Sequence, residues 1–166
     1  MWHHMTMSRL SELPPYPQSL AGTLLAAREA VMAPIRPFLR ASGVTDQQWR
    51  VLRVLADAGP LDASGIAELA LLYPPSVTRI VRELVERGLL SRSTDAEDRR
   101  RSVISITDEG QALVRRTAEH TAIVLDRYTD AFGHDRLTRF IAEATALTEL
   151  LARFAPSEAR APQDED

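Results

Sequence analysis

The fold of this chain is decided by YPPSVTRIVRELVERGLLSRSTDAEDRRRSVISITD, residues 73–108. The first part is typical of a helix that begins at Pro74 and Pro75, because proline suits the first helical turn. The helix is expected to end at Gly88, since glycine accepts the left-handed conformation found just past a helix end. Four apolar side chains at helical spacing form one face that can pack: Val77, Val81, Leu84 and Val85. The polar side chains elsewhere on the helix are then free to contact a partner.

Two short strand patterns follow this helix, from Leu89 to Thr94 and from Ser102 to Thr107. Both alternate or carry β-branched residues, as strands do. The run of acids and arginines from Asp95 to Arg101 joins them as the tip of a hairpin. A helix followed by an arginine-tipped hairpin indicates a winged helix, which is suited to gripping DNA.

Composition indicates a globular protein that dissolves in water. A chain of 166 residues can bury roughly 70 % of its unfolded surface, so it needs neither a disulfide nor a metal. No apolar run approaches the ~20 residues of a membrane span, and the N-terminus lacks the pattern of a secretory signal. We therefore expect no membrane partner and a cytoplasmic location. The net charge is −3, but arginines outnumber acids between Arg79 and Arg101, whereas acids dominate from Pro156 onward.

The predicted fold class is mainly α with a small β-hairpin wing, in which a winged helix-turn-helix domain is flanked by N- and C-terminal dimerisation helices. We divide the chain into five segments: an arm-like or disordered N-terminus (1–18), an N-terminal dimerisation helix (19–44), the winged helix-turn-helix domain (45–108), C-terminal dimerisation helices (109–155) and a disordered acidic tail (156–166). Pro34 and Pro37 should bend or divide the N-terminal helix.

Helix starts are marked by side chains that can cap a first turn: Ser19, Thr45 or Asp46, Asp62 or Ser64, and Thr107 or Asp108. The short helix that begins near Asp62 is expected to bury three side chains: Ile66, Leu69 and Ala70. The apolar faces of the terminal helices are larger than the winged domain can bury. A second copy of the chain could cover them, so a homodimer is expected. A two-fold dimer places two reading helices about one DNA turn apart, which fits double-stranded DNA with a palindromic operator.

The candidate DNA-binding side chains lie in two places. On the helix they are Ser76, Thr78, Arg79 and Arg82, because arginine can pair with guanine and hydroxyls with either base type. In the wing they are Asp98, Arg99, Arg100 and Arg101, because a guanidinium at a narrow tip can enter a minor groove. For each set the alternative is a solvated charged surface, and the proximity of hairpin and helix favours the functional interpretation.

No enzyme is predicted, because the sequence has no nucleophile motif, glycine-rich phosphate loop or paired-carboxylate pattern. The absence of cysteine excludes thiol catalysis and cysteine-zinc sites. His120 and His134 lack a ligand-type neighbour at metal-binding spacing. We therefore expect neither a metal nor a cofactor.

The assembled motifs resemble the MarR family of transcriptional regulators over about residues 20–154. The specific part is the wing, where Asp98-Arg99-Arg100 and the stretch from Ser102 to Gly110 are similar to the family's D-x-R and "LT-x-x-G" patterns, with Ile106 in place of leucine. The resemblance implies that Arg100 reaches the minor groove and that the preceding helix is the recognition helix.

Within the family, residues 27–55 are similar to regulators of homoprotocatechuate degradation operons. This resemblance implies a small aromatic carboxylate as effector, bound between the dimerisation helices and the winged domain. The candidate pocket residues are Arg28, Trp49, Arg50 and Arg53, with arginine for the carboxylate and tryptophan as an apolar wall. For each of them the alternative is a core or surface role.

The functional hypothesis is a ligand-responsive repressor of an aromatic-acid catabolism operon, released from a palindromic operator by its effector. Two alternatives remain: a MarR-type regulator that needs no ligand, and a winged-helix module that docks a protein and has no DNA role.

Overall fold

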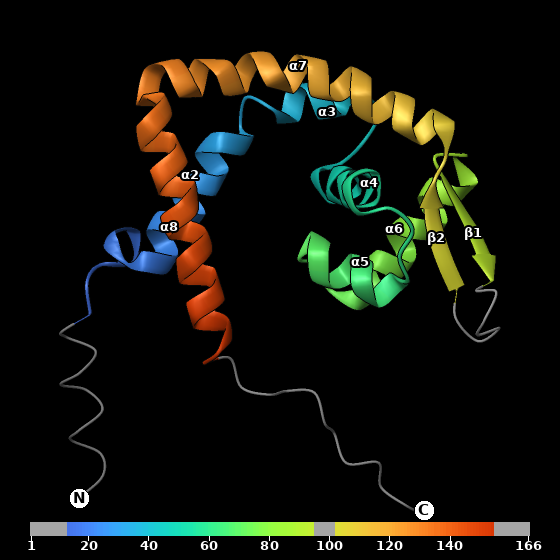
Figure 1. Ribbon diagram of the computed structural model, residues 1–166, viewed down its shortest axis with the longest axis horizontal. Helices are drawn as coiled ribbons and strands as arrows, with labels where there is room; N and C mark the ends of the chain where they lie inside the picture. Colours follow the sequence, from blue (N-terminus) through green and yellow to red (C-terminus); the bar gives the residue numbers. More distant parts are fainter. Residues whose placement is uncertain (1–12, 95–101, 155–166) are drawn as a thin grey trace, which may run out of the picture. The chain divides into compact units, whose positions relative to one another are not determined.

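The computed structural model describes residues 13–94 and 102–154, which form helices and one two-stranded hairpin (Figure 1). In chain order the elements are the 3-10 helix η1 (Tyr16–Gln18), α2 (Leu20–Met32), α3 (Arg36–Ala41), α4 (Asp46–Ala58), α5 (Ala63–Ala70), α6 (Pro74–Glu86), β1 (Leu90–Thr94), β2 (Ser102–Ile106), α7 (Asp108–Phe132) and α8 (His134–Ala152). The predicted fold class is therefore confirmed. The chain divides into two compact units, residues 1–124 and 125–166, and the boundary falls within α7.

Prolines divide the N-terminal helical region, as the sequence predicted. The segment from Ala33 to Ile35 separates α2 from α3, and Pro37 occupies the first turn of α3. The start of α2 is capped by Ser19, whose Oγ accepts a hydrogen bond from the Gly22 N–H at 3.0 Å. Residues 16–18, in the segment predicted to be arm-like, are exposed and form one 3-10 turn next to the start of α2.

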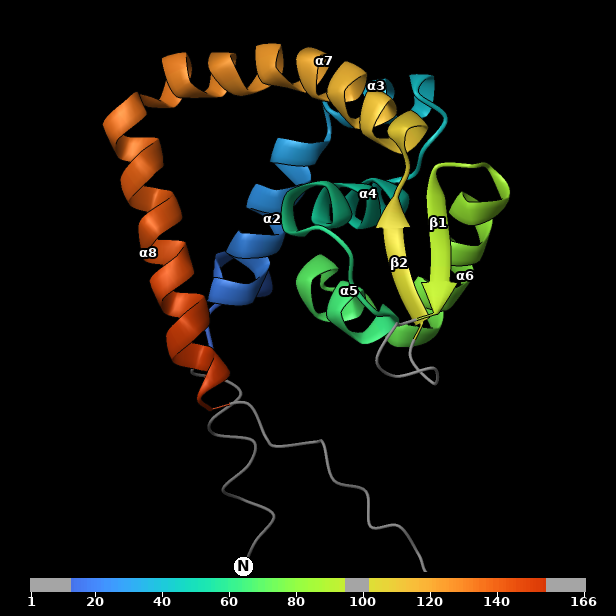
Figure 2. The same ribbon diagram turned by 45° about the vertical axis from the view of Figure 1, so that its right-hand side comes forward.

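The core of the first unit lies where α4, α5 and α6 pack against one another and against the hairpin (Figure 2). The largest fully buried apolar side chains of this region are Val51, Leu52, Leu55, Ile66, Val77, Ile80, Val81, Leu84 and Ile104. The expectation for α5 was partly wrong, because Leu69 is 54 % exposed and Ala67 is buried instead. This short helix contacts α4, α6 and β2 at once, so its buried face follows these neighbours rather than a single stripe.

Local capping fixes α4, on which most of the candidate ligand residues lie. Thr45 and Gln48 form a capping box in which each side chain accepts a hydrogen bond from the backbone N–H of the other, at 3.1 Å and 3.0 Å. The α4 helix therefore begins at a rigid first turn. The next helix, α5, is capped by Asp62, whose side chain accepts a hydrogen bond from the Gly65 N–H at 2.8 Å.

The hairpin is tied to the helices on both sides. Antiparallel β1 and β2 pair with Leu90 opposite Ile106, and Leu61 adds a single bridge to the far edge of β2 through two backbone hydrogen bonds with Ile104. Directly after β2, α7 starts at a close approach to the hairpin. A Cβ at Gly110 would lie only 2.2 Å from the Leu89 carbonyl oxygen, so this position requires glycine.

The second unit, as far as it is described, holds the end of α7 and α8. The Arg136 guanidinium lies over the Phe132 ring, with its carbon 4.3 Å from the ring centroid. The α8 helix exposes several large apolar side chains: Phe140, Ile141, Leu150 and Leu151. No helix within residues 13–94 and 102–154 combines the length and apolar character required to span a membrane.

Candidate functional site

The α6 helix has one buried face and one exposed polar face. Val77, Ile80, Val81 and Leu84 are at most 1 % exposed. Of the four side chains predicted to contact DNA, Thr78, Arg79 and Arg82 are exposed and Ser76 is half-buried. The structure thus brings all four predicted residues onto the part of α6 that the core leaves uncovered. The C-terminal end of this helix leads directly into β1, with Gly88 in the turn at a φ of 71°.

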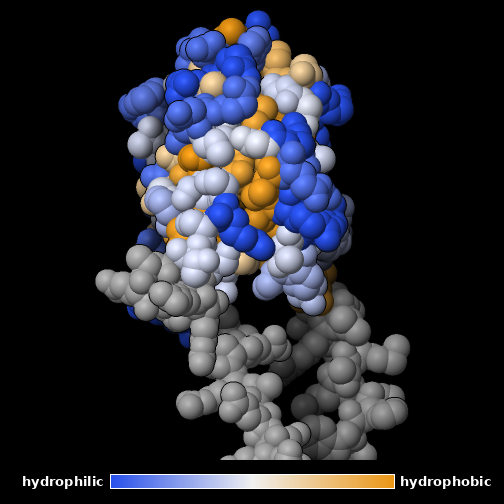
Figure 3. Space-filling view, turned by 90° about the vertical axis from the view of Figure 1, so that its right-hand side faces the viewer, coloured by the Kyte–Doolittle hydropathy of each residue, from blue (hydrophilic) through white to orange (hydrophobic). Residues whose placement is uncertain are grey.

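The hairpin lies beside α6, and its outer strand carries hydrophilic side chains. Ser91, Arg92, Ser93 and Thr94 are all exposed. Seen from the side of the hairpin, hydrophilic surface flanks a central hydrophobic band (Figure 3). The predicted wing residues Asp98, Arg99, Arg100 and Arg101 lie outside the described residues.

The turn between α5 and α6 completes a helix-turn-helix. Leu71 ends α5 in the left-handed conformation, with a φ of 52°, although its side chain is 83 % exposed. The backbone of this turn is held from α4, because Arg50 Nη1 donates to the carbonyl oxygens of Ala70 and Leu71 at 3.0 Å and 3.1 Å. Tyr73, the last residue before α6, is 72 % exposed.

The four candidate ligand residues lie around the first two turns of α4. Asp46 accepts from Arg28 Nη2 of α2 at 2.6 Å, and its other oxygen lies 4.0 Å from Arg50 Nε. This hydrogen bond to Asp46 is the main reason that the pKa of Arg28 is raised above its ordinary value. Sequence reasoning missed Asp46 as a member of this cluster. An acid four residues before Arg50 on the same helix face was the signal that could have found it.

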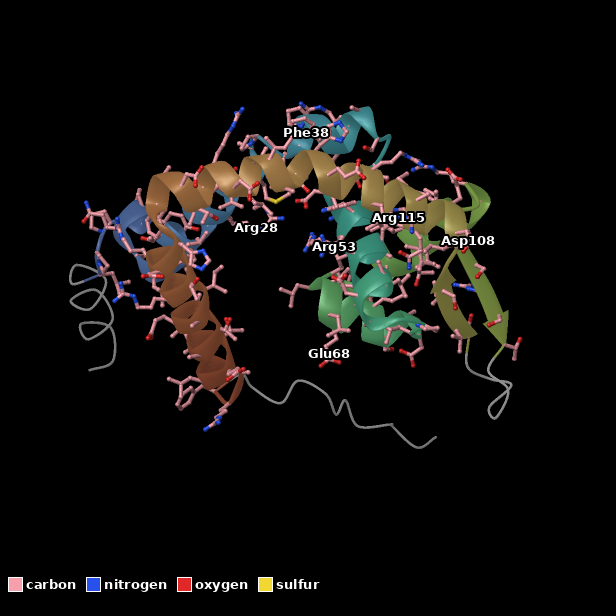
Figure 4. The ribbon with its side chains drawn as sticks, turned by 45° about the horizontal axis from the view of Figure 1, so that its top comes forward. Arg28, Phe38, Arg53, Glu68, Asp108 and Arg115 are labelled. Atoms are coloured by element: carbon pink, nitrogen blue, oxygen red, sulfur yellow. The ribbon has the colours of Figure 1, made fainter. Side chains whose placement is uncertain are left out.

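Arg53 and Trp49 form the second half of this cluster. Trp49 is 8 % exposed, and the Arg53 guanidinium carbon lies 5.8 Å from the centroid of its ring. Arg53 also pairs with Asp57, one turn later, at 3.1 Å, in an exposed ion pair. Figure 4 shows Arg28 on α2 and Arg53 on α4. The side chain of Arg53 is 44 % exposed, about as much as that of Arg28 at 42 % and more than that of Arg50 at 31 %.

A pocket of about 390 Å³, which was not predicted from the sequence, lies elsewhere in the first unit. It is lined by residues of α3, its C-terminal turn and α7: Phe38, Ala41, Ser42, Leu113, Arg116, Thr117 and His120. The His120 Nδ1 is 2.8 Å from the Arg116 carbonyl oxygen, and the Phe38 and His120 rings lie 5.6 Å apart. None of the predicted ligand residues lines this pocket. Within the described residues no group of three or more acids and histidines is placed to hold a metal ion.

Comparison with known proteins identifies relatives that cover most of the chain. The model of the MarR family matches residues 42–101. The HTH-type transcriptional regulator FarR of Neisseria gonorrhoeae is 35 % identical over 135 residues, which cover 81 % of this chain and 88 % of FarR. The homoprotocatechuate degradative operon repressor of Escherichia coli is 41 % identical over 98 residues, covering 59 % of this chain and 66 % of the repressor.

Solved structures agree with this assignment. The fold is similar to that of NadR in complex with 4-hydroxyphenylacetate, with a TM-score of 0.69 and 33 % identity over 88 % of this chain and all of NadR (100 %). It is also similar to the transcriptional repressor CouR bound to a 23-mer DNA duplex, with a TM-score of 0.71 and 27 % identity over 86 % of this chain and 96 % of CouR. The family predicted from the sequence is confirmed: the chain is a transcriptional regulator that belongs to the MarR family.

Proposed function

We propose that this protein is a repressor that binds double-stranded DNA as a homodimer and leaves it when a small aromatic carboxylate binds. The observation that carries this proposal is the α6 helix, whose exposed polar face lies opposite a fully buried apolar face and is followed at once by a hairpin. The similarity to CouR, which was solved on DNA, supports it. A regulator of this kind acts in the cytoplasm, where the DNA is.

In this proposal α6 enters the major groove, and its four exposed or half-exposed polar side chains contact base edges and phosphates: Ser76, Thr78, Arg79 and Arg82. The wing arginines Arg99, Arg100 and Arg101 contact the backbone or the minor groove, and Asp98 orients Arg100 through an ion pair. Base contacts supply the sequence preference, while the wing supplies affinity that depends on salt.

The homodimer is proposed from apolar surface in each unit. In α2, Leu20 is 57 % exposed and Leu25 is 50 % exposed. In α8, Phe140 is 47 % exposed and Ile141 is 56 % exposed. A second copy of the chain can cover such surface, and two-fold symmetry then matches a palindromic operator.

The effector is proposed to bind at Arg53 and Trp49, with Arg28 and Arg50 nearby. The indole of Trp49 offers an apolar wall, and the Arg53 guanidinium can form two parallel hydrogen bonds with a carboxylate. NadR was solved with 4-hydroxyphenylacetate, and a homoprotocatechuate operon repressor is among the relatives, so phenylacetates are the first ligands to test. Binding there can alter the helix-turn-helix because α4 also carries Arg50, which holds the turn before α6. A ligand that fits one arrangement of these helices better than another shifts the DNA-binding equilibrium.

The test is a fluorescence anisotropy titration of the DNA upstream of the gene at several salt concentrations, with and without 4-hydroxyphenylacetate. We expect log Kd to rise linearly with log salt, and the ligand to weaken binding. Arg100→Ala should bind all duplexes more weakly and with a smaller salt slope, whereas Arg79→Ala should lose preference at one base position by about 1–3 kcal/mol. A protein-docking module would show no salt-dependent binding. A regulator that needs no ligand would bind with the same affinity in the presence of every aromatic acid.

A further inference from the structure

The carboxylate of Glu83, on the third turn of α6, is held by two partners at once. Its Oε1 accepts from Arg79 Nη1 at 2.9 Å, and its Oε2 accepts from Gln48 Nε2 of α4 at 3.0 Å. Each oxygen therefore has its own donor, and the two donors come from different helices. Helical side chains lean toward the N-terminus, which places Glu83 over the turn that carries Arg79.

Gln48 fixes this carboxylate from the protein side. Its side chain is only 8 % exposed, and both ends of its amide are bonded: Oε1 accepts from the Thr45 N–H at 3.0 Å, and Nε2 donates to Glu83. Turning the amide over would present its oxygen to a carboxylate and its N–H groups to an N–H. One orientation is therefore strongly preferred, and Glu83 is anchored to the rigid first turn of α4.

This anchor restricts Arg79 but leaves it accessible. The Arg79 side chain remains 55 % exposed, and the contact to Glu83 uses one of the five guanidinium N–H donors. A free arginine side chain loses considerable rotamer freedom when it is immobilised against a partner. Arg82, one turn away on the same helix, is exposed and has no ion-pair partner within residues 13–94 and 102–154.

We propose that Glu83 is a specificity-determining residue that positions Arg79 for base recognition, through the chain Gln48–Glu83–Arg79. The proposal rests on the proposed DNA-binding function and extends it, because it assigns different roles to two arginines of one helix. Arg79 is presented in a set direction that suits a base edge, whereas Arg82 suits a phosphate, which tolerates many approach angles. Fixing a side chain before binding reduces the entropy lost on binding.

The experiment measures Kd for the upstream DNA and for a scrambled duplex of equal length, using full-length wild type, Glu83→Gln and Glu86→Gln. Glu86 is the matched control, since it is an exposed acid of α6 and its substitution removes the same charge. Both variants should bind scrambled DNA more tightly, because each lacks one carboxylate that repels the DNA phosphates. The specificity ratio is the Kd for scrambled DNA divided by the Kd for upstream DNA. We expect this ratio to be about 2- to 12-fold lower in Glu83→Gln than in Glu86→Gln, which is the range for one immobilised side chain. In an Arg79→Ala background, Glu83→Gln should cause no further loss.

Equal specificity ratios for the two glutamine variants would overturn the proposal. A higher specificity ratio for Glu83→Gln would also overturn it, because it would mean that Glu83 competes with DNA for Arg79. Additive losses with Arg79→Ala would also overturn it. If wild type binds both duplexes equally, the proposed sequence-specific DNA binding is wrong. This outcome is distinct from a failure of the positioning role of Glu83 alone. A measurement without DNA completes the test: NMR of the Arg79 guanidinium should show slower rotation in wild type and in Glu86→Gln than in Glu83→Gln, and equal rates would count against the positioning role.

Discussion

The same substitution should have different effects at Arg50 and Arg53, two arginines one turn apart on α4. Arg50 donates to the carbonyl oxygens of Ala70 and Leu71. The Arg53 guanidinium lies over the Trp49 ring, and its ion pair among the described residues is with Asp57. Replacement of either by methionine keeps the aliphatic stem and removes the charge. We expect Arg50→Met to destabilise the fold, and Arg53→Met to leave stability nearly unchanged while weakening the response to an aromatic acid.

The magnitude follows from the contacts of Arg50. Hydrogen bonds from a charged donor contribute about 1.5–3 kcal/mol each when buried. The Arg50 side chain is 31 % exposed and Leu71 lies at the surface, so water replaces part of this loss. We therefore expect a total of about 1–3 kcal/mol for Arg50→Met. For a chain of this length the corresponding fall in Tm is about 2–12 °C. Loss of the exposed Arg53 contacts should cost less than about 1 kcal/mol.

The assay is urea unfolding followed by far-UV circular dichroism, combined with thermal shift in 4-hydroxyphenylacetate. In wild type, a ligand at about 100 times its Kd should add roughly 2.7 kcal/mol of stability, and Arg53→Met should lose most of that increment. Equal destabilisation by the two variants would refute the assignment of Arg50 to the helix-turn-helix turn. An unchanged ligand increment in Arg53→Met would refute the proposed carboxylate site.

Three further predictions concern backbone geometry and charge. Leu71→Gly should be more stable than Leu71→Ala by about 0.5–1 kcal/mol in urea unfolding, because both remove an exposed side chain but only glycine adopts a φ of 52° without strain, an advantage partly offset by the greater freedom of glycine in the unfolded chain. Gly110→Ala should lower stability by about 2–3 kcal/mol, because its Cβ would lie 2.2 Å from the Leu89 carbonyl oxygen, and a Tm equal to that of wild type would contradict this packing. The hydrogen bond from Arg36 lowers the pKa of Glu29 below its ordinary value of 4.5, so the stabilisation it gives is present above that pH and disappears as the pH falls through the lowered pKa. Glu29→Gln should therefore be less stable than wild type at pH 7 and equally stable in strong acid, as measured by Tm.

Features that depend on neighbouring residues in the chain were predictable from the sequence. Proline placed the breaks in the N-terminal helices, and Ser19, Thr45 and Asp62 capped the helices that they precede, because caps act within one turn. The ends of α6 and of the two strands were predicted to within two residues, since helical and strand periodicities differ clearly. The positions on α6 of the four residues proposed to contact DNA follow from that same periodicity.

Contacts between distant segments were not predictable in this way. Arg50 was predicted as a ligand residue from its charge, but its partners are carbonyl groups twenty and twenty-one residues later. Gln48 has nothing in its local pattern that points to Glu83, thirty-five residues away. The pocket between α3 and α7 likewise requires the packing of two segments that the sequence separates by the whole winged domain. A single sequence reports periodicity and capping, whereas these features depend on tertiary packing.

The bridge between Leu61 and Ile104 lowers the tendency of this hairpin to pair with strands of other molecules. A strand edge with free N–H and C=O groups can recruit a strand of another molecule and start aggregation. In the described residues, Leu61 occupies one position on the outer edge of β2, and β1 is only five residues long with Arg92 among its exposed side chains. Neither edge is therefore a good template for an additional strand, so the hairpins of neighbouring molecules remain separate.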